Sequence, residues 1–412
     1  MKIGIWGMGK SGLSALEYLA QKSQDQLFAI NRGEPSTWAG DDVLKHISLQ
    51  QCFAEEKAPQ DLDLIILSPG VDRKSPQITS YIERGVDVIS EIELAAKECS
   101  LPIIAITGSN GKTTTTSMIS LALQKAGKRV FCGGNIGVPF CEMYKGTYDF
   151  AVLELSSFQL ESVRDFHAQV AIILNITPTH MERYDDVQDY INAKLNITKN
   201  QTQDDLLIAP QKYLTGQATF NCIRPLAGYD FSHTRLVGEH HKQNLYCVRE
   251  VLRFFKLDNV KEIVQDLISN FAGVEFRMQV ERKTDGLIII NDAKSTNIDA
   301  TISGIESFKD LNTNLILGGQ LRSSQIDFIQ ALDSYDFECI YVYGEAADLL
   351  HKEMSAKHQV VKMKGLEDVV QKLGEHAPKG VILYSPAFPS FDQYENYQAR
   401  GKHFSSLVSQ YL

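Results

Sequence analysis

Short runs of apolar residues alternate with stretches of helical periodicity along almost the whole chain. In the first part, strands are predicted at 2–6, 27–30 and 63–67, and a leucine stripe of helical spacing lies between the first two. Short apolar runs without interruption are typical of strands that are buried on both faces of a sheet. The alternation therefore predicts βα units and a mainly parallel sheet.

The same plan appears twice more along the chain. A second set of predicted strands lies at 102–107, 129–134, 149–155 and 169–175, and a third set lies at 287–292, 314–319, 339–344 and 380–385. We therefore predict an α/β protein with three domains, at 1–93, 94–274 and 275–412. Parallel sheets bind ligands at the carboxyl ends of their strands, and each motif described below follows a predicted strand.

Composition narrows the class of protein. The 412 residues include 41 Lys and Arg against 51 Asp and Glu, so a protein that binds nucleic acid through an overall basic surface is not expected. No apolar run reaches the ~20 residues of a membrane helix, and the glycine-interrupted N-terminus is not typical of a signal peptide. The seven cysteines contain no CxxC pair, which indicates a reducing cytoplasm rather than disulfides or a zinc ribbon.

The most specific motif is TGSNGKTTTT at 107–116, directly between a predicted strand and a predicted helix. Gly108 and Gly111 allow backbone N–H groups to face a phosphate, Lys112 adds a positive charge, and Thr113 or Thr114 offers a hydroxyl to Mg²⁺. Ile106 occupies the first-glycine position of the general P-loop, so the general pattern fails there. The alternative is a glycine turn before a Thr-rich helix cap, but the order of strand, loop, lysine and helix favours nucleotide binding.

A second glycine motif, formed by Gly7, Gly9 and Gly12, is weaker. An NAD site would carry an acidic residue at the end of the following strand, where this chain has Asn31 and Arg32. We interpret the segment as a site for a diphosphate-bearing nucleotide, with the 68–70 turn closing the same pocket. An NADP site and a purely structural turn remain alternatives.

Three further candidate residues follow the phosphate loop in the sequence. Glu154 ends a predicted buried strand and is placed to hold Mg²⁺, although it could instead cap the helix at Ser156 or Ser157. His180 follows another strand, and a structural hydrogen bond explains a single histidine equally well. Lys194 lies on a predicted helix, where most lysines face solvent.

The motifs TGSNGKTTTT, GGNIGVPF, LELSSFQLE, LNITPTHMERY and YINAKLNI occur in this order and resemble the Mur ligases. These enzymes are ATP-dependent amide ligases of peptidoglycan precursor assembly, and so take part in cell wall biogenesis. The runs INDAKSTN and SPAFPSFDQYENYQARG are more similar to the members that add D-glutamate. The resemblance covers essentially the whole chain. It implies a Rossmann-like UDP-sugar domain, a central P-loop-type ATPase domain, and a Rossmann-like C-terminal domain that closes over ATP and the amino acid.

The resemblance also implies a reaction. D-Glutamate would be added to UDP-N-acetylmuramoyl-L-alanine through an acyl phosphate, in a cytoplasmic monomer that uses ATP and two Mg²⁺ ions and has only small-molecule partners. Lys194 matches the lysine that is carbamylated in this family. The catalytic and metal positions implied are Lys112, Thr113, Glu154, His180 and Lys194. The positions implied for ATP are Gly108, Asn110, Gly111, Lys112, Thr113, Thr114, Asn244, Arg277, Asp292 and Lys294.

The remaining implied positions bind the other two substrates. Those on the UDP-sugar side are Lys10, Ser11, Asn31, Arg32, Gly70, Asn135 and Ser157. Those on the D-glutamate side are Thr296, Arg322, Ser390, Phe391 and Tyr397.

The chain departs from the family pattern in two places. Gln320 and Arg322 stand where the family usually has Asp and Lys, and arginine can hold a carboxylate with a different reach. His241 stands where the family usually has Asn. A folylpolyglutamate-type ligase, an NADP oxidoreductase and a non-catalytic nucleotide sensor are the alternatives. The N-terminal GMGKSG segment argues against the first, because folate ligases begin at the ATPase domain.

Overall fold

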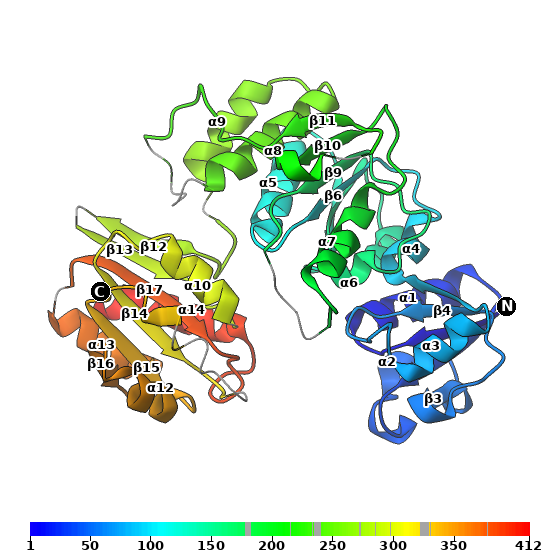
Figure 1. Ribbon diagram of the computed structural model, residues 1–412, viewed down its shortest axis with the longest axis horizontal. Coiled ribbons are helices and arrows are strands. Elements are labelled where there is room, and N and C mark those ends of the chain that lie inside the picture. Colours follow the sequence, from blue (N-terminus) through cyan, green and yellow to red (C-terminus); the bar gives the residue numbers. More distant parts are fainter. Residues whose placement is uncertain are drawn as a thin grey trace. The chain divides into compact units, whose positions relative to one another are not determined.

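The computed structural model describes all residues except 178–182, 215, 233, 235–239, 272, 285, 297, 322–328, 330 and 377. The chain folds into two compact units: Met1–Tyr229 with Lys242–Leu267, and Asp230–His241 with Ile268–Leu412. The first unit contains two sheets and the second contains one (Figure 1). None of the helices in the described part of the chain is both long and apolar enough to cross a membrane.

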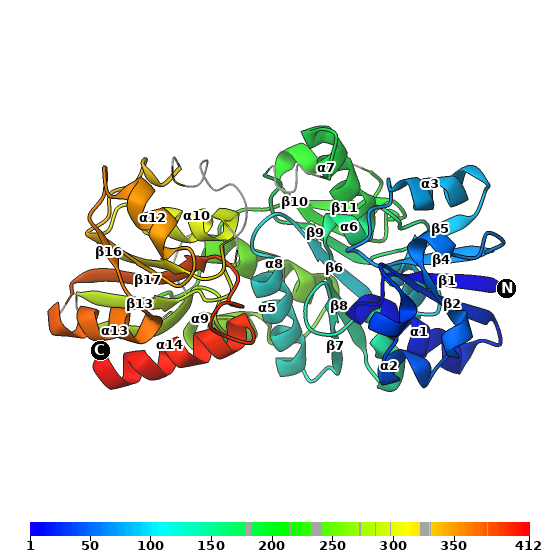
Figure 2. The same cartoon turned by 90° about the horizontal axis from the view of Figure 1, so that it is seen from below.

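The first sheet has the order β3-β2-β1-β4-β5, and all its pairs are parallel. Its strands are β1 (Lys2–Trp6), β2 (Gln26–Asn31), β3 (Cys52–Ala54), β4 (Leu64–Leu67) and β5 (Asp87–Ser90), and its helices are α1 (Lys10–Lys22), α2 (Asp41–Leu44), α3 (Pro76–Glu83) and α4 (Glu91–Ala96). Side chains alternate between the two faces of a strand, so Ile3 and Ile5 pack with α1 whereas Ile65 and Leu67 pack with α3. Figure 2 shows α1 and α3 on opposite sides of this sheet.

The second sheet is also parallel throughout, in the order β11-β10-β9-β6-β8-β7. Its strands are β6 (Ile103–Thr107), β7 (Val130–Gly134), β8 (Phe150–Glu154), β9 (Val170–Ile173), β10 (Leu206–Ala209) and β11 (Thr219–Cys222). Its helices are α5 (Lys112–Lys125), α6 (Ser157–Leu160), α7 (Val187–Leu195), α8 (His240–Phe254) and α9 (Val260–Asn270). One hydrophobic cluster joins a face of this sheet to the α1 face of the first sheet, which explains why both belong to one compact unit.

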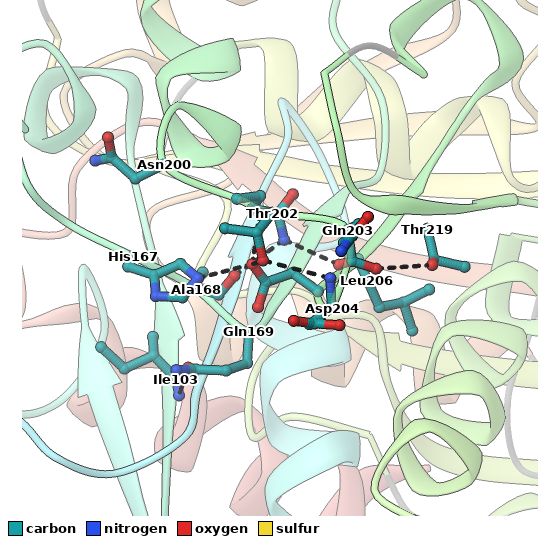
Figure 3. Close-up of polar contacts among 12 residues, drawn as sticks. Ile103, His167, Ala168, Gln169, Asn200, Thr202, Gln203, Asp204, Leu206 and Thr219 are labelled. Carbon is teal, nitrogen blue, oxygen red and sulfur yellow. Dashed lines mark hydrogen bonds and ion pairs between the residues drawn. The ribbon is translucent and has the colours of Figure 1, made fainter.

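The amino ends of β9 and β10 are tied together by a polar network (Figure 3). His167 Nε2 lies 2.8 Å from Asp205 Oδ2, and the same oxygen accepts hydrogen bonds from the backbone N–H and the hydroxyl of Thr202. Ile103 N–H, at the start of β6, donates to Gln169 Oε1 at 2.7 Å. The network thus lies at the edge of the sheet opposite the carboxyl ends that carry the motifs.

The third sheet has the order β12-β13-β17-β14-β15-β16, with β12 antiparallel to β13 and the other pairs parallel. Its strands are β12 (Gln279–Thr284), β13 (Leu287–Asn291), β14 (Thr313–Gly318), β15 (Cys339–Tyr343), β16 (Val360–Lys362) and β17 (Gly380–Ala387). Its helices are α10 (Ile298–Glu306), α12 (Ala347–Met354), α13 (Leu366–His376) and α14 (Tyr397–Tyr411). Helices α10 and α12 cover one face, and α13 and α14 cover the other (Figure 2).

Both the predicted fold class and the predicted strands are confirmed: each apolar run named above forms a strand. The predicted helix after β6 is α5, which ends before Gly127. The antiparallel β12 was not predicted, because its sequence QVERKT is polar and it lies at an edge of its sheet.

Candidate functional site

The phosphate loop joins the carboxyl end of β6 to the first turn of α5. Gly111 is the N-cap residue of α5 and has φ 84° and ψ −10°, a left-handed conformation that L side chains rarely adopt. A Cβ there would lie 3.2 Å from Leu174 Cδ1 and 3.5 Å from Asn244 Oδ1. Glycine is therefore needed both for the turn and for space, and the helix N-terminus behind it favours anions.

Lys112 folds back over the loop. Its Nζ donates to the carbonyl oxygens of Gly108 at 2.7 Å and Ser109 at 2.9 Å. The ammonium group is thus held at the mouth of the helix N-terminus, as a phosphate site requires.

Asn175 fixes the shape of the same loop, although it was not among the predicted site residues. Its Oδ1 accepts from the N–H of Asn110 at 2.9 Å, its Nδ2 donates to the Asn110 carbonyl at 3.0 Å, and its own carbonyl accepts from Ser109 N–H at 2.8 Å. Asn175 is the last residue of the strand predicted at 169–175, so its place at the carboxyl end of a strand was the available signal.

Glu154 lies at the carboxyl end of β8 and is 2% exposed. Thr113 donates its hydroxyl to Glu154 Oε2 at 2.7 Å, and Asn135 Nδ2 donates to Oε1 at 2.8 Å. The alternative role as a helix cap is wrong, because Ser156 forms its capping box with Gln159 instead. Glu154 thus joins the first turn of α5 to the loop after β7.

The donor set at this point fits a magnesium ion. Magnesium is usually held by one or two protein oxygens together with phosphate oxygens and water, and Thr113 and Glu154 supply a hydroxyl and a carboxylate side by side. Within the described ranges, no three His, Cys, Asp or Glu side chains cluster as a ready metal site. His180 and Arg322 lie outside the described residues.

Lys194 does not face solvent; it is 2% exposed on α7. Its Nζ donates to the Gly108 carbonyl at 3.0 Å and lies 4.7 Å from the ring centroid of Tyr190. Burial, and then the nearby charge of Lys112, lowers the pKa of Lys194 to about 7, with Glu154 opposing the shift. The structure therefore brings a readily neutralised amine to the phosphate loop, and the solvated-face alternative is wrong.

Of the other residues expected near ATP in the first unit, Thr114 and Asn244 are both buried. Asn244 Nδ2 has no hydrogen-bond partner in the part of the chain that the structure describes. His241, which departs from the family pattern, is also buried, and burial lowers its pKa to about 3.

The N-terminal glycine motif forms the predicted turn between β1 and α1. A Cβ on Gly12 would lie 1.9 Å from the carbonyl oxygen of Gly7, so α1 approaches the turn too closely for any side chain. Lys10 and Ser11 begin α1, and Asn31 Oδ1 accepts from Met8 N–H at 3.4 Å. Arg32 is 87% exposed, with Nε 3.6 Å from Glu55 Oε2.

The turn after β4 is hydrogen-bonded to the glycine turn after β1, the neighbouring strand. Ser68 donates its hydroxyl to the Gly7 carbonyl at 2.6 Å, which ties the 68–71 turn to the glycine turn. A Cβ on Gly70 would meet no atom within 4 Å, so the turn is open at that residue.

In the second unit, Asp292 is held by its own neighbours. Oδ1 accepts from Met278 N–H at 3.0 Å, and Oδ2 accepts from the hydroxyls of Ser295 at 2.5 Å and Ser385 at 2.8 Å. Burial raises the pKa of this carboxyl, against the effect of those donors. Asp292 therefore organises the carboxyl ends of β13 and β17.

Among the described residues predicted to bind D-glutamate, Thr296 follows β13, and Ser390 and Phe391 follow β17. Lys294 Nζ lies 6.0 Å from the ring centroid of Tyr397, the first residue of α14. Ser390 is buried, whereas Phe391 is 62% exposed. Thr296, Arg277 and Gln320 are partly accessible in the loops of this unit.

Sequence reasoning missed one buried arginine, Arg400, and one largely covered arginine, Arg183. Arg400 on α14 is fully buried and donates to the carbonyls of Phe388, Ala293 and Gly318 at 2.9, 3.1 and 3.4 Å. Arg183 donates to carbonyls of the 68–71 turn. A single arginine gives no signal of such contacts, because most of the partners are main-chain oxygens distant in sequence.

Comparison with known proteins gives two family matches. Residues 106–265 match the Mur ligase middle domain, and residues 1–90 match the Mur ligase MurD-like N-terminal domain. The UDP-N-acetylmuramoylalanine–D-glutamate ligase of Koribacter versatilis is 32% identical over 440 residues, which cover 99% of this chain and 97% of that protein. The ligase of the same name from Coxiella burnetii is 33% identical over 439 residues, with 98% of both chains covered.

Solved structures share the fold at lower identity. MurF of Thermotoga maritima in complex with ADP has a TM-score of 0.57 and 15% identity, over 93% of this chain and 94% of that one. MurC of Thermotoga maritima has a TM-score of 0.54 and 19% identity, over 100% and 99%.

Proposed function

The chain belongs to the Mur ligase family, and we propose that it uses ATP to join D-glutamate to UDP-N-acetylmuramoyl-L-alanine in peptidoglycan precursor synthesis. The relatives that carry this activity in their names match essentially the whole chain, including the regions outside the two family models. This whole-length match favours D-glutamate addition over a folylpolyglutamate-type reaction.

One observation carries the chemistry of the proposal: the phosphate loop, the Thr113–Glu154 pair and the buried Lys194 converge at the N-terminus of α5. A helix N-terminus with a lysine binds phosphates, and a carboxylate beside a hydroxyl suits magnesium. No Ser–His–Asp or Cys–His set is needed, because phosphoryl transfer depends on positioning and electrostatic stabilisation.

In the proposed reaction, the carboxylate of UDP-N-acetylmuramoyl-L-alanine attacks the γ-phosphorus of ATP, and ADP leaves. Lys112 and the N–H groups at the start of α5 stabilise the charge on the phosphoryl oxygens. The amine of D-glutamate then attacks the acyl phosphate, and inorganic phosphate leaves as the amide forms. Magnesium, when bound, neutralises phosphate charge. We propose two magnesium ions, held by Thr113, Glu154, His180 and Lys194.

Lys194 is proposed to act as a carbamate. The ammonium group would first lose a proton; the neutral amine would then attack CO₂, form an N–C bond and release a second proton, so that a cation becomes an anion. Its pKa of about 7 supports this step, because a substantial fraction of the amine is neutral near pH 7. Carbamylation also removes a buried positive charge beside Lys112.

The substrates are assigned to the three proposed domains. Residues 1–93 would bind the UDP sugar, 94–274 the ATP, and 275–412 would close over ATP and D-glutamate. The residues proposed on the nucleotide side are Asn244, Arg277, Asp292 and Lys294. Those proposed on the D-glutamate side are Thr296, Arg322, Ser390, Phe391 and Tyr397.

The seven free cysteines support a cytoplasmic protein, and we propose a monomer that acts on small molecules alone.

The test is a phosphate-release assay on the purified protein. It contains ATP, Mg²⁺, UDP-N-acetylmuramoyl-L-alanine and one amino acid from a panel that includes D-glutamate, L-glutamate and D-aspartate. The proposal expects release that requires both the UDP-linked acceptor and D-glutamate. Release with a pteroyl acceptor in place of the UDP-linked one, or release that ignores D-glutamate, would contradict it.

A further inference from the structure

The guanidinium group of Arg183 connects two regions that the proposed function places around the UDP-linked acceptor. Its Nη1 donates to the carbonyl of Pro69 at 2.9 Å, and its Nη2 donates to the carbonyl of Val71 at 3.2 Å. These two carbonyls flank Gly70. Arg183 lies between β9 and α7, more than 100 residues away in sequence, so this contact is a tertiary one.

The turn that Arg183 holds has further hydrogen bonds within the first sheet. Val71 N–H donates to Ser68 carbonyl at 3.0 Å and closes the turn, while the Ser68 hydroxyl anchors it to Gly7. Gly70 itself has open space where a side chain would lie. The carbonyls on either side of Gly70 accept from Arg183, so this side chain helps to fix the position of Gly70.

The other side of the guanidinium group contacts α6. Its carbon lies 4.1 Å from the ring centroid of Phe158, and its Nη2 donates to Glu161 Oε2 at 3.0 Å. Phe158 follows Ser157, which the family resemblance assigns to the UDP-sugar side together with Gly70. Tyr184 stacks on Phe158 and donates to Glu161 Oε1 at 2.5 Å, so this side is itself held firmly.

Burial and geometry make this contact specific for arginine. The side chain of Arg183 is only 13% exposed and that of Glu161 17%. A planar guanidinium group can donate to several acceptors in one plane while stacking on a ring, and a lysine ammonium cannot reproduce that arrangement.

We propose that Arg183 is a positioning residue for the UDP-linked acceptor, because it sets the Gly70 turn at a fixed separation from Ser157 on α6. The inference rests on the proposed function. Arg183 contacts no reacting group; it acts through the turn and the helix. Loss of the contact should weaken acceptor binding more than phosphoryl transfer, since the turn lies on the sugar side of the site.

The experiment compares the wild type with Arg183→Met and Arg183→Lys. Calorimetry measures the Kd for UDP-N-acetylmuramoyl-L-alanine without turnover, and steady-state kinetics give KM for the acceptor, KM for ATP, and kcat. Arg183→Met should raise the acceptor Kd and KM about tenfold to a hundredfold, with KM for ATP and kcat changed by less than about threefold. Arg183→Lys should fall between the wild type and Arg183→Met.

A matched control is Arg164→Met. Arg164, between α6 and β9, is exposed, and its Nη1 lies 2.8 Å from Oδ2 of Asp87, the first residue of β5, whereas Gly70 follows the opposite, carboxyl end of the parallel strand β4. Arg164→Met should leave acceptor binding unchanged. Equal acceptor affinity in wild type and Arg183→Met would overturn the inference. If Arg183→Met does not fold, unchanged acceptor affinity in Arg183→Lys would overturn it.

The same data separate this inference from the proposed function. A wild type that binds the acceptor but forms no product with D-glutamate would contradict the proposed reaction, and loss of acceptor affinity in Arg183→Met would still support the positioning role.

Discussion

The Nζ of Lys194 lies 3.0 Å from the carbonyl oxygen of Gly108, so a buried amine of α7 contacts the first glycine of the phosphate loop. Lys112 Nζ donates to the same oxygen at 2.7 Å. Burial lowers the pKa of Lys194 most, and the repulsion between two charged amines on one carbonyl lowers it further.

Carbamylation of Lys194 should depend on pH and on CO₂. The pKa is lowered from 10.5 to about 7, so the neutral amine that reacts with CO₂ becomes abundant as pH rises through 7. Activity measured in CO₂-depleted buffer should therefore fall, and bicarbonate should restore it more fully at pH 8 than at pH 6. Native mass spectrometry should detect the added carboxylate on the wild type and not on Lys194→Met. Activity that is insensitive to CO₂ depletion would contradict the modification.

Gly111 and Gly127 offer a matched pair for the phosphate loop. Both have left-handed φ values, 84° and 76°, at opposite ends of α5, so an alanine at either should cost about 1–2 kcal/mol of stability. A Cβ at Gly127 meets nothing within 4 Å, whereas one at Gly111 approaches Leu174 and Asn244. Gly111→Ala should thus raise KM for ATP by roughly tenfold or more, and Gly127→Ala should not. Equal changes in KM for ATP in the two variants would contradict the role of Gly111 in the phosphate site.

Lys112→Ala should reduce kcat by about 10²–10³-fold, because it removes the cation that stabilises the transferring phosphoryl group. Lys125→Ala is the control at the other end of α5, where Lys125 pairs with Asp266 at 2.6 Å. Circular dichroism and thermal unfolding should show that both variants fold. A kcat of Lys112→Ala equal to that of the wild type would contradict the proposed role of Lys112 in the phosphate loop.

Two buried glutamates on α4 should respond oppositely to the same substitution. Glu93 accepts hydrogen bonds from the backbone N–H groups of Arg164, Asp165 and Phe166, at 2.8, 2.8 and 3.0 Å. Glu91 accepts one from Cys141 N–H at 2.5 Å, and its Oε2 has no partner among the described residues. Burial raises the pKa of Glu91 from 4.5 to about 7.

Because the folded protein holds the Glu91 proton more tightly than the unfolded chain, stability is lost as pH rises from about 4.5 to about 7. Glu91→Gln should remove this loss and raise the free energy of unfolding at pH 8 by on the order of 3 kcal/mol. Glu93→Gln should lower it by about 1–3 kcal/mol, because one oxygen cannot serve three N–H groups. Urea unfolding at pH 5 and pH 8 measures both, and a stabilised Glu93→Gln would contradict this explanation.

The sequence was sufficient for the strands and for the phosphate loop, because both signals are local. Apolar runs at strand length predicted the core of each sheet, and a glycine turn followed by Lys112 predicted an open helix N-terminus. The contact between Glu154 and Thr113 could also be predicted, because neighbouring parallel strands end at the same edge of a sheet.

Burial of charged side chains on helices and loops could not be predicted in this way. Lys194 has a helix-surface spacing, and only the packing of α7 against the phosphate loop buries it. Arg183 binds the carbonyl of Pro69 and Arg400 binds the carbonyl of Ala293, both more than 100 residues away in sequence, and main-chain acceptors leave no residue-type signal.

A crystal structure with a non-hydrolysable ATP analogue, Mg²⁺ and UDP-N-acetylmuramoyl-L-alanine tests the account most directly. We predict that the triphosphate binds against the N–H groups at the start of α5, with Lys112 on its outer phosphates and the acceptor carboxylate directed at the γ-phosphorus. Triphosphate density elsewhere, with the first turn of α5 free of phosphate, would contradict the account.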